Sequence, residues 1–240
     1  MTYCLGILLP CGLTMASDSR SNAGIDNITT VKKTAFFEVP GERVIAVLSA
    51  GNLATTQSVV SKLRQAQGTG KIGWDLMASN TMFDAAQVVG ATLRETINYD
   101  RDHVSRYGSA DGTFLVGGQI KGEPPRLFQI YSAGNFVEAT PRNPFLQNGE
   151  AKYGKPILDR ALDPTLPLPQ IAKLALLSFD ATIRSNLSVS PPIDLWSYQP
   201  DSFNSGSARK FSDGDPYWTS LSKAYSDGLA SLVTSLPEMP

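Results

Sequence analysis

The opening segment of the chain constrains its fold more than any other segment does. Residues 2–9 (TYCLGILL) are apolar at nearly every position and show no alternation of polar and apolar side chains. A strand with one face in water would alternate. Continuous apolarity therefore predicts a strand covered on both faces, as in a sheet packed between another sheet and a layer of helices. After a Pro-Cys-Gly turn, residues 13–20 are expected to form its hairpin partner.

The order of the remaining segments predicts the fold class. Strands are expected at 2–9, 13–20, 28–39, 43–49, 113–120, 126–131, 136–140, 193–198 and 208–212. Helices, in which apolar residues recur every three or four positions, are expected at 53–67, 83–97, 153–162, 168–182 and 215–232. Loops are expected at 21–27, at 107–112, and in the two-proline segment that leads to residues 148–150. Segregated runs of strands and helices favour an α+β domain with two sheets flanked by helix pairs.

Length and composition limit the possible partners. No linker-like break interrupts the 240 residues, and single domains of about 200–250 residues are routine, so we expect one domain over residues 1–240. A formal net charge of −1 without Lys/Arg clusters argues against a nucleic-acid partner. No run approaches the roughly 18 apolar residues of a membrane span. Two cysteines, Cys4 and Cys11, and a start without a basic signal-peptide region favour a cytoplasmic protein.

No cofactor and no metal are expected. The only histidine, His103, lies among charged residues after a predicted helix, and a His-based triad or His-ligated metal site would have to centre there. Gly117-Gly118 lacks the spacing and the lysine of a phosphate-binding loop. Cys4 is more simply explained as a small core residue than as a nucleophile.

Thr2 carries the main chemical prediction. If Met1 is removed, Thr2 has a hydroxyl and a free α-amine on one residue. The reference pKa of that amine is about 7.7–8.0, so it can accept a proton near neutral pH. Such a threonine is both nucleophile and base, a variant of the Ser–His arrangement. Taken alone, a threonine at position 2 more often reflects only efficient removal of the initiator methionine.

Three further features follow Thr2 along the chain. Asp18 ends the hairpin strand, Lys32–Lys33 lies on the next expected strand, and the turn Ala50-Gly51-Asn52 opens a helix at the end of the fourth. Each has an ordinary explanation, as a loop carboxylate, a solvated strand end or a helix start. Together they predict a site that combines a nucleophile, a carboxylate, a lysine and a turn glycine.

These segments resemble the start of a proteasome β-subunit. The resemblance is carried by Thr2, Gly12, Asp18-Ser19-Arg20, Ala23-Gly24 and Thr30-Val31-Lys32-Lys33. In that family a mature Thr, an Asp and a Lys cooperate, which implies these roles for Thr2, Asp18 and Lys33. Lys33 takes the lysine position if one residue is deleted in the loop after Gly24, and Lys32 is the fallback.

The same resemblance assigns residues around the nucleophile. Gly51 matches the glycine whose backbone N–H stabilises the developing oxyanion, an interaction that often dominates catalysis. Ser21 and Asn22 match the segment that pairs with an extended substrate, and Ser49 matches a wall of the pocket for the substrate side chain. Ser188 matches a serine of the proteasome site.

The later part of the chain resembles a narrower branch, Anbu, the bacterial ancestral-type homologue of proteasome β-subunits. The matching runs are 149–160, 184–188 and 215–218. The resemblance covers nearly the whole chain. It implies a four-layer αββα sandwich and proteasome-type peptidase activity. It also implies a homo-oligomeric ring or open helical ring of about a dozen subunits.

Two positions depart from the proteasome pattern. Glu150 follows Gly149 where a proteasome β-subunit has a serine beside the amine. A carboxylate close to the amine would raise the pKa of the amine and make it a poorer base, unless Lys33 compensates. Ser185 stands where the pattern has an Asp, three residues before Ser188. The roles of Glu150 and Ser185 stay open, and a solvated loop carboxylate explains Glu150 equally well.

Three interpretations of function follow. The first is a threonine-type hydrolase that cleaves peptide or amide bonds through an acyl ester on Thr2. The second, motivated by Glu150 and Ser185, is a catalytically weak or vestigial module for assembly or peptide binding. The third keeps the chemistry but takes a small non-peptide amide as substrate.

Overall fold

Two five-stranded antiparallel sheets form the centre of the molecule. The computed structural model describes residues 2–22 and 28–239. The first sheet has the order β10-β1-β2-β11-β12, and the second has the order β5-β6-β7-β8-β9. The first sheet consists of β1 (Tyr3–Leu9), β2 (Gly12–Asp18), β10 (Phe145–Gly149), β11 (Ile193–Tyr198) and β12 (Arg209–Phe211). The second consists of β5 (Thr34–Val39), β6 (Arg43–Gly51), β7 (Gly112–Ile120), β8 (Arg126–Ile130) and β9 (Phe136–Glu138).

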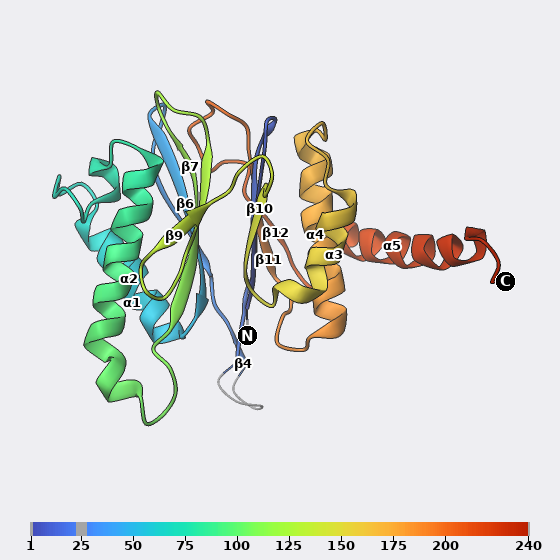
Figure 1. Ribbon diagram of the computed structural model, residues 1–240, viewed down its shortest axis with the longest axis horizontal. Helices are drawn as coiled ribbons and strands as arrows, with labels where there is room; N and C mark the ends of the chain where they lie inside the picture. The colour runs from blue at the N-terminus through green and yellow to red at the C-terminus, as the bar shows by residue number, and fades with distance from the viewer. Residues whose placement is uncertain (1, 23–27, 240) are drawn as a thin grey trace.

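Helices cover the outer side of each sheet, as Figure 1 shows. On the second sheet lie α1 (Leu53–Ala66) and α2 (Met82–Val104), with the short 3-10 helix η1 (Leu76–Ala78) between them in the chain. On the first sheet lie α3 (Ala151–Ala161) and α4 (Leu168–Ser185), and α5 (Pro216–Ser235) follows. The mixture of helices and antiparallel sheets confirms the expected α+β class.

Three separate hydrophobic clusters hold these elements together. The first lies between the second sheet and α1 with α2, and includes Val47, Val59, Leu93 and Phe114. The second joins the first sheet to α3, α4 and the start of α5, and includes Leu5, Leu176 and Phe179. The third contains the facing side chains of both sheets, among them Met15, Leu48, Leu115 and Trp196. Burial of these apolar faces is the main favourable contribution to folding.

The opening strand confirms the prediction made from its apolar sequence. Tyr3, Leu5 and Ile7 belong to the cluster under the helices, whereas Cys4 belongs to the cluster between the sheets. Only Leu8 in this strand is partly exposed. Because successive side chains of a strand point to opposite faces, a strand buried on both faces needs apolar residues at every position.

The structure corrects two expectations near the predicted site. Residues 28–39 are not one strand, because β4 (Ile28–Thr30) pairs with β3 (Arg20–Asn22) whereas β5 pairs with β6. The chain changes partner at residues 31–33, so Lys32 and Lys33 lie in a connection and not on a strand. The expected loop at 21–27 is wrong for residues 21–22, which belong to β3. Residues 23–27 lie outside the described residues.

Strand β10 corrects a further expectation, because a loop is predicted there. This short strand follows Pro144, carries the polar residues Gln147 and Asn148, and pairs only with β1 at the edge of the first sheet. Its conformation depends on that pairing and not on a periodic pattern of its own. Its end brings Gly149 beside the start of β1, where the candidate nucleophile lies.

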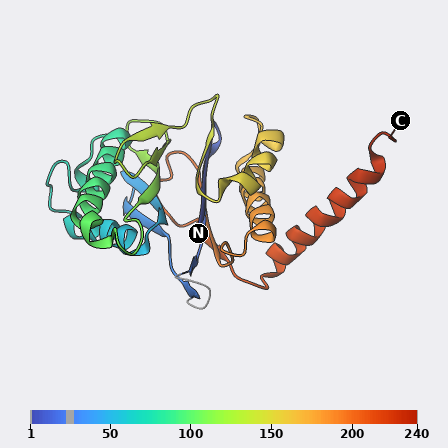
Figure 2. The same cartoon turned by 60° about the horizontal axis from the view of Figure 1, so that its bottom comes forward.

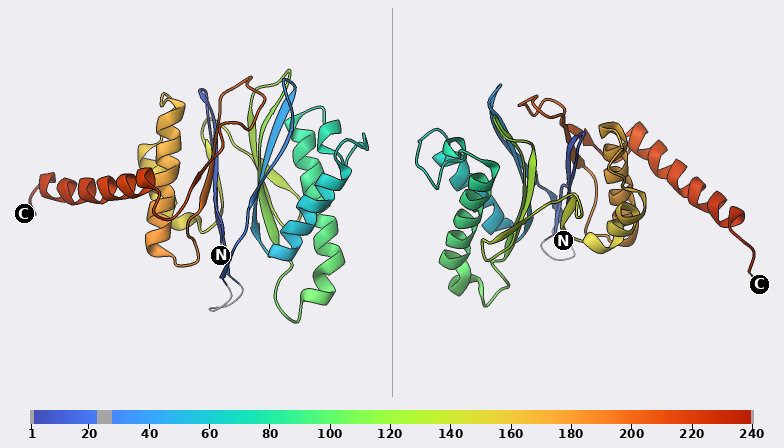
Figure 3. Two further views of the ribbon diagram at one scale, coloured as in Figure 1. Left: turned by 180° about the vertical axis from the view of Figure 1, so that it is seen from behind. Right: turned by 45° about the horizontal axis from the view of Figure 1, so that its top comes forward.

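Helix α5 leaves the body of the molecule. Trp218 at its base is buried, and Leu221 packs against the cluster under α3 and α4. Farther along, apolar side chains are exposed: Leu229, Leu232, Val233 and, just after the helix, Leu236. Figures 2 and 3 show α5 projecting away from both sheets and from the other helices. Over residues 2–22 and 28–239, none of the helices is long and apolar enough to cross a membrane.

Candidate active site

Thr2 lies where the start of β1 meets the end of β10. Its carbonyl oxygen accepts a hydrogen bond from the Glu150 N–H at 2.9 Å, and its residue is 9% exposed. Gly149 has φ +79°, and a Cβ there would lie 1.8 Å from the Thr2 carbonyl oxygen. Only glycine fits this turn, because other residues rarely adopt that φ and have no room for a side chain. The turn therefore holds Thr2 in place.

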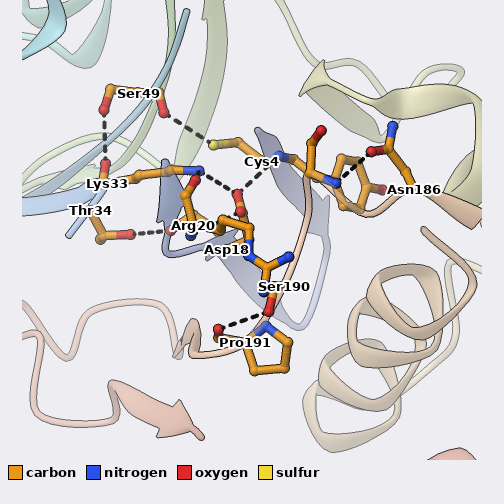
Figure 4. A network of polar contacts seen from close by, with 12 residues as sticks. Cys4, Asp18, Arg20, Lys33, Thr34, Ser49, Asn186, Ser190 and Pro191 are labelled. Atoms are coloured by element: carbon orange, nitrogen blue, oxygen red, sulfur yellow. Dashed lines mark hydrogen bonds and ion pairs between the residues drawn. The ribbon is translucent and has the colours of Figure 1, made fainter. Parts of the chain in front are cut away.

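Asp18 joins the first residues of the chain to Lys33. The Asp18 Oδ1 atom accepts hydrogen bonds from the Tyr3 N–H at 3.0 Å and from Lys33 Nζ at 2.7 Å. Its Oδ2 atom accepts from the Arg20 N–H at 3.1 Å. Figure 4 shows Asp18 and Lys33 facing each other with Arg20 beside them. The Lys33 ammonium therefore lies two hydrogen bonds from the peptide nitrogen that follows Thr2.

The ion pair is shielded from water. The side chain of Asp18 is 0% exposed and that of Lys33 is 5% exposed. Burial raises the pKa of Asp18, and this rise is opposed by Lys33 and by the Tyr3 and Arg20 N–H groups. Lys33 Nζ also donates to the Arg20 carbonyl oxygen at 2.5 Å. Every charged group of the pair thus has several partners, as a buried ion pair requires.

Ser49 fixes the connection that carries Lys33. Its N–H donates to the Lys33 carbonyl oxygen at 3.0 Å and its Oγ donates to the same oxygen at 3.3 Å. The Cys4 thiol donates to the Ser49 carbonyl oxygen at 3.5 Å. Burial raises the pKa of Cys4 well above its ordinary value. The thiol therefore stays protonated, as expected of a core residue.

The backbone N–H of Gly51 points toward the same site. The Asn52 N–H, just after β6, donates to the Asp111 carbonyl oxygen on the β7 side at 2.8 Å. The Ser49 N–H of β6 donates to the Lys33 carbonyl oxygen on the opposite side. N–H groups alternate between the two neighbours of an antiparallel strand. The Gly51 N–H therefore points away from β7, to the edge where Lys33 lies. Within the described residues, the Gly51 N–H donates to no carbonyl oxygen of a loop or turn.

The backbone of Gly51 also excludes any other residue. Its φ is +111°, and a Cβ would lie 2.6 Å from the Asp111 carbonyl oxygen. The next residue, Asn52, caps α1 by accepting the Thr55 N–H at 3.2 Å. The site therefore includes a glycine N–H at the end of a strand, immediately before a helix.

A pocket of about 360 Å³ adjoins Lys33 and Ser49. One wall is the face of α1 that carries Leu53, Gln57, Val60 and Arg64, which recur every three or four residues. Arg64 on this wall and Lys32 from the connection before β5 are exposed cations of the pocket, and none of the described residues that line the pocket is acidic. We call this cavity the α1 pocket.

Among the described residues, the side chains of the remaining predicted residues form no hydrogen bond with Thr2, Asp18 or Lys33. Ser188 lies in a connection in which its N–H donates to Asn186 Oδ1 at 2.9 Å. Arg20 Nη1 donates to the Leu187 carbonyl oxygen at 2.6 Å. Because Arg20 lies two residues after Asp18, this hydrogen bond holds the connection next to the ion pair. This role of Arg20 was not predicted from the sequence. Among the described residues, no hydrogen bond joins Ser188 to Thr2, Asp18 or Lys33.

Among the described residues, the side chains of two uncertain residues, Ser185 and Glu150, form no hydrogen bond with the site. Ser185 ends α4 and is exposed, and Glu150 precedes α3 with no side-chain hydrogen bond to the helix. Glu150 touches the site only through its backbone N–H, which donates to Thr2. In β3, Ser21 and Asn22 pair with Thr29 and Ile28. Met1, Ala23 and Gly24 lie outside the described residues.

No group of three or more His, Cys, Asp or Glu side chains that could hold a metal occurs in the described parts of the chain. The groups gathered near the start of β1 are the Thr2 hydroxyl, the Asp18 carboxylate, the Lys33 ammonium and the Gly51 N–H.

Comparison with known proteins identifies the family. A scan against protein-family models and a search of curated proteins found no match. Solved structures match over nearly the whole chain. Anbu from Yersinia bercovieri is 46% identical with a TM-score of 0.93, and 99% of each chain is covered. Anbu from Hyphomicrobium sp. strain MC1 is 47% identical with a TM-score of 0.91, again over 99% of each chain.

A third match is the helical assembly of the Anbu complex from Pseudomonas aeruginosa. It is 45% identical with a TM-score of 0.93, and covers 99% of this chain and 98% of that one. Identity of this size over full length, together with the Thr2, Asp18, Lys33 and Gly51 geometry, agrees with the resemblance found in the sequence. The chain belongs to the Anbu family of ancestral β-subunits.

Proposed function

We propose that this chain is a threonine-type N-terminal nucleophile hydrolase that cleaves peptide or amide bonds in a homo-oligomeric, proteasome-like assembly. One observation carries the proposal: Asp18 Oδ1 accepts both the Tyr3 N–H and Lys33 Nζ. That shared acceptor connects a buried ammonium to the peptide nitrogen that follows the proposed nucleophile, Thr2. Family membership supports the same reading.

The proposed reaction begins after removal of Met1. The Thr2 hydroxyl attacks the carbonyl carbon of the substrate amide, and its proton passes to the Thr2 amine or through Lys33. The Gly51 N–H donates to the oxyanion that forms. The C–N bond then breaks as the leaving nitrogen takes that proton, and an acyl ester remains on Thr2. Water adds to the ester, gives a proton to the amine, and releases the acid while the hydroxyl is restored.

Other residues hold the substrate in this proposal. An extended peptide pairs with the β3 segment at Ser21 and Asn22, and its side chain enters the α1 pocket past Ser49. The cations Lys32 and Arg64 give this pocket a positive charge that favours an acidic side chain there. Ser188 completes the site from the connection that Arg20 holds.

We propose one domain for the whole chain, arranged as a four-layer αββα sandwich, in the cytoplasm. The three hydrophobic clusters support the layers, since each fills one space between neighbouring layers. The unpaired state of Cys4 and Cys11 agrees with a reducing compartment. We propose a ring or open helical ring of identical subunits. The exposed apolar side chains of α5 support it, because such side chains usually find a partner.

Covalent labelling tests the proposed function. The purified protein is treated with an electrophile that bridges a hydroxyl and the neighbouring amine, and intact mass gives both the adduct and the state of Met1. We expect Met1 to be absent and one adduct per chain on Thr2. Thr2→Ala should abolish the adduct. Thr219→Ala, an exposed threonine of α5, is the matched control and should label like the unchanged protein.

Three results would contradict or redirect the proposal. Labelling that survives Thr2→Ala excludes Thr2 as the nucleophile. Retained Met1 with no adduct favours the alternative, a vestigial module for assembly or peptide binding, which Glu150 and Ser185 suggest. Adduct formation without cleavage of peptides or isopeptides, but with cleavage of small amides, changes the substrate class and keeps the chemistry.

A further inference from the structure

The side chain of Tyr3, the residue that follows Thr2, ends in a buried polar cluster between the first sheet and its helices. The Tyr3 phenol oxygen accepts a hydrogen bond from Gln147 Nε2 at 2.6 Å, and it lies 2.6 Å from Ser178 Oγ. Gln147 belongs to β10 and Ser178 belongs to α4. The ring of Tyr3 packs on Phe179 of α4, with 4.6 Å between the ring centroids. We call Tyr3, Gln147 and Ser178 the Tyr3 cluster.

The Tyr3 cluster is closed to water and its hydroxyl groups are paired. Tyr3 and Ser178 are both 0% exposed. Burial raises the pKa of Tyr3 to about 12, so the phenol keeps its proton at neutral pH. Because the phenol oxygen already accepts the Gln147 N–H, its own proton is free to donate to Ser178 Oγ. Removal of the phenol oxygen would therefore leave two polar groups without this partner, which weakens the packing at this point.

Helix α3 closes the cluster on another side. Gln147 Nε2 donates to the Ala151 carbonyl oxygen at 3.4 Å, in the first turn of this helix. A Cβ at Gly154 would lie 2.1 Å from Ser178 Oγ and 2.8 Å from the Tyr3 hydroxyl oxygen. The backbone of α3 can approach this closely only because residue 154 is a glycine. The Tyr3 cluster therefore connects the start of β1 to β10, α3 and α4.

Tyr3 also holds one end of the peptide group that joins it to Thr2. The carbonyl oxygen of this group accepts the Glu150 N–H at 2.9 Å, and its N–H donates to Asp18 Oδ1 at 3.0 Å. Because a peptide group is planar, these two hydrogen bonds set the orientation of the whole plane. The ring and hydroxyl of Tyr3, fixed in the cluster, hold the Cα atom at the end of this plane. The rotations that remain are those about the bonds of Thr2 itself.

We propose that Tyr3 is a positioning residue for the Thr2 nucleophile. Its hydroxyl acts through the hydrogen bonds to Gln147 and Ser178, and it does not touch the substrate. This inference rests on the proposed function, because it assigns a role in the reaction of Thr2. The first residues of a chain are poorly ordered unless other groups hold them. An attacking oxygen must lie about 3–3.5 Å from the atom that it attacks, and an error of about 1 Å can lower the rate about 100-fold.

The rate of covalent labelling tests the proposal on the full-length, assembled protein. The probe is a peptide epoxyketone, an electrophile that bonds to both a hydroxyl and the neighbouring amine. Tyr3→Phe removes only the phenol oxygen. We expect it to lower the maximal labelling rate of Thr2 at least about tenfold, because the hydroxyl is displaced from its attacking position. The half-saturating concentration of the probe should stay nearly unchanged, because the residues that bind the probe are intact.

Tyr198→Phe is the matched control. Tyr198 is 1% exposed, lies in the same sheet and donates its hydroxyl to Gln119 Oε1 at 2.6 Å. It is opposite Leu13, at the other end of β2 from Asp18. This variant loses an equally buried and hydrogen-bonded hydroxyl, yet it should label like the unchanged protein. An unchanged labelling rate in Tyr3→Phe, or an equal loss of rate in Tyr198→Phe, would overturn the proposal.

Hydrogen exchange of the Glu150 N–H tests the proposal without any reaction at Thr2. This N–H donates to the Thr2 carbonyl oxygen, so its exchange rate reports how firmly Thr2 is held. We expect exchange at least about tenfold faster in Tyr3→Phe and unchanged in Tyr198→Phe. If the unchanged protein forms no adduct, the proposed function fails, whereas equal exchange in the two variants overturns the positioning role. If Tyr3→Phe does not fold, Ser178→Ala takes its place, because it removes the partner and keeps the ring.

Discussion

Asp18 and Asp194 are carboxylates on two adjacent strands, yet their surroundings are opposite. Asp18 is fully buried and accepts three hydrogen bonds, one of them from Lys33. Asp194 lies one register position away, but among the described residues its Oδ2 atom is buried without a partner and its carboxylate forms no ion pair. The first region is a closed unit, a buried ion pair whose hydrogen bonds fix the positions of Tyr3, Arg20 and Lys33 relative to one another. The second leaves one carboxylate oxygen buried without a hydrogen-bond partner among the described residues.

Breaking the closed pair should have the largest effect. Asp18→Asn leaves the Lys33 ammonium buried without its counter-ion, so we expect the free energy of unfolding to fall by about 3–5 kcal/mol in urea denaturation. Asp18→Asn with Lys33→Met should recover part of this loss, because no unpaired charge remains. Asp163→Asn, at an exposed carboxylate, should leave the midpoint of urea denaturation nearly unchanged. A loss below about 1 kcal/mol for Asp18→Asn would contradict a closed unit.

The turn that holds Thr2 should be the next most sensitive feature. Gly149→Ala meets both an unfavourable φ and a contact of 1.8 Å with the Thr2 carbonyl oxygen. We expect a loss of at least about 2 kcal/mol and no labelling of Thr2. Gly68 has nearly the same φ, +78°, with nothing within 4 Å of a Cβ. Gly68→Ala should therefore cost only about 1 kcal/mol, and equal losses would refute the role of the contact.

A smaller effect is expected where the two regions meet. The Ser17 and Thr34 hydroxyls, 2.9 Å apart, join β2 to β5, and Ser17 lies next to Asp18 in the chain and opposite Asp194 in the sheet. Removing one leaves the other buried and unpaired, so Ser17→Ala should lower the free energy of unfolding by about 1 kcal/mol. A double-mutant cycle with Thr34→Val measures the interaction directly. Strict additivity would show that the two hydroxyls are independent.

The open carboxylate should matter least for stability. Because burial raises the pKa of Asp194 above its ordinary 3.8, the folded protein keeps this proton when the unfolded chain has released it. Its contribution is present at low pH and is lost as pH rises through the raised pKa. The stability of the unchanged protein relative to Asp194→Asn should fall over that range and then level off. At neutral pH Asp194→Asn should be within about 1 kcal/mol of it or more stable. A constant difference at all pH values would contradict the raised pKa.

Much of this architecture could be predicted, because local patterns determine it. The continuous apolar run of β1 requires cover on both faces, and the three- and four-residue recurrence in α2 and α4 marks amphipathic helices. The resemblance of residues 2–33 pointed to Thr2, Asp18 and Lys33, and the structure brings Asp18 and Lys33 into contact beside Tyr3. Whether Thr2 reacts stays a prediction.

Features that depend on distant partners could not be predicted. Strand β10 exists because β1 offers it an edge, and its polar residues give no period of their own. Lys33 lies in a connection because β4 and β5 belong to different sheets. The N–H of Trp196, which is buried without a partner among the described residues, also depends on how the two sheets pack and has no signature in the local sequence.

Helix α5 is anchored to the body of the molecule at Trp218, so a change of its angle there displaces its far end. At about 1.5 Å per residue, its 20 residues extend about 30 Å, so a tilt of about ten degrees at the base moves the tip by about 5 Å. If neighbouring subunits bind one another through the outer half of α5, the orientation of this helix at Trp218 determines the pitch of the filament or ring. Small changes in the packing of Trp218 would then change the spacing between all neighbouring subunits.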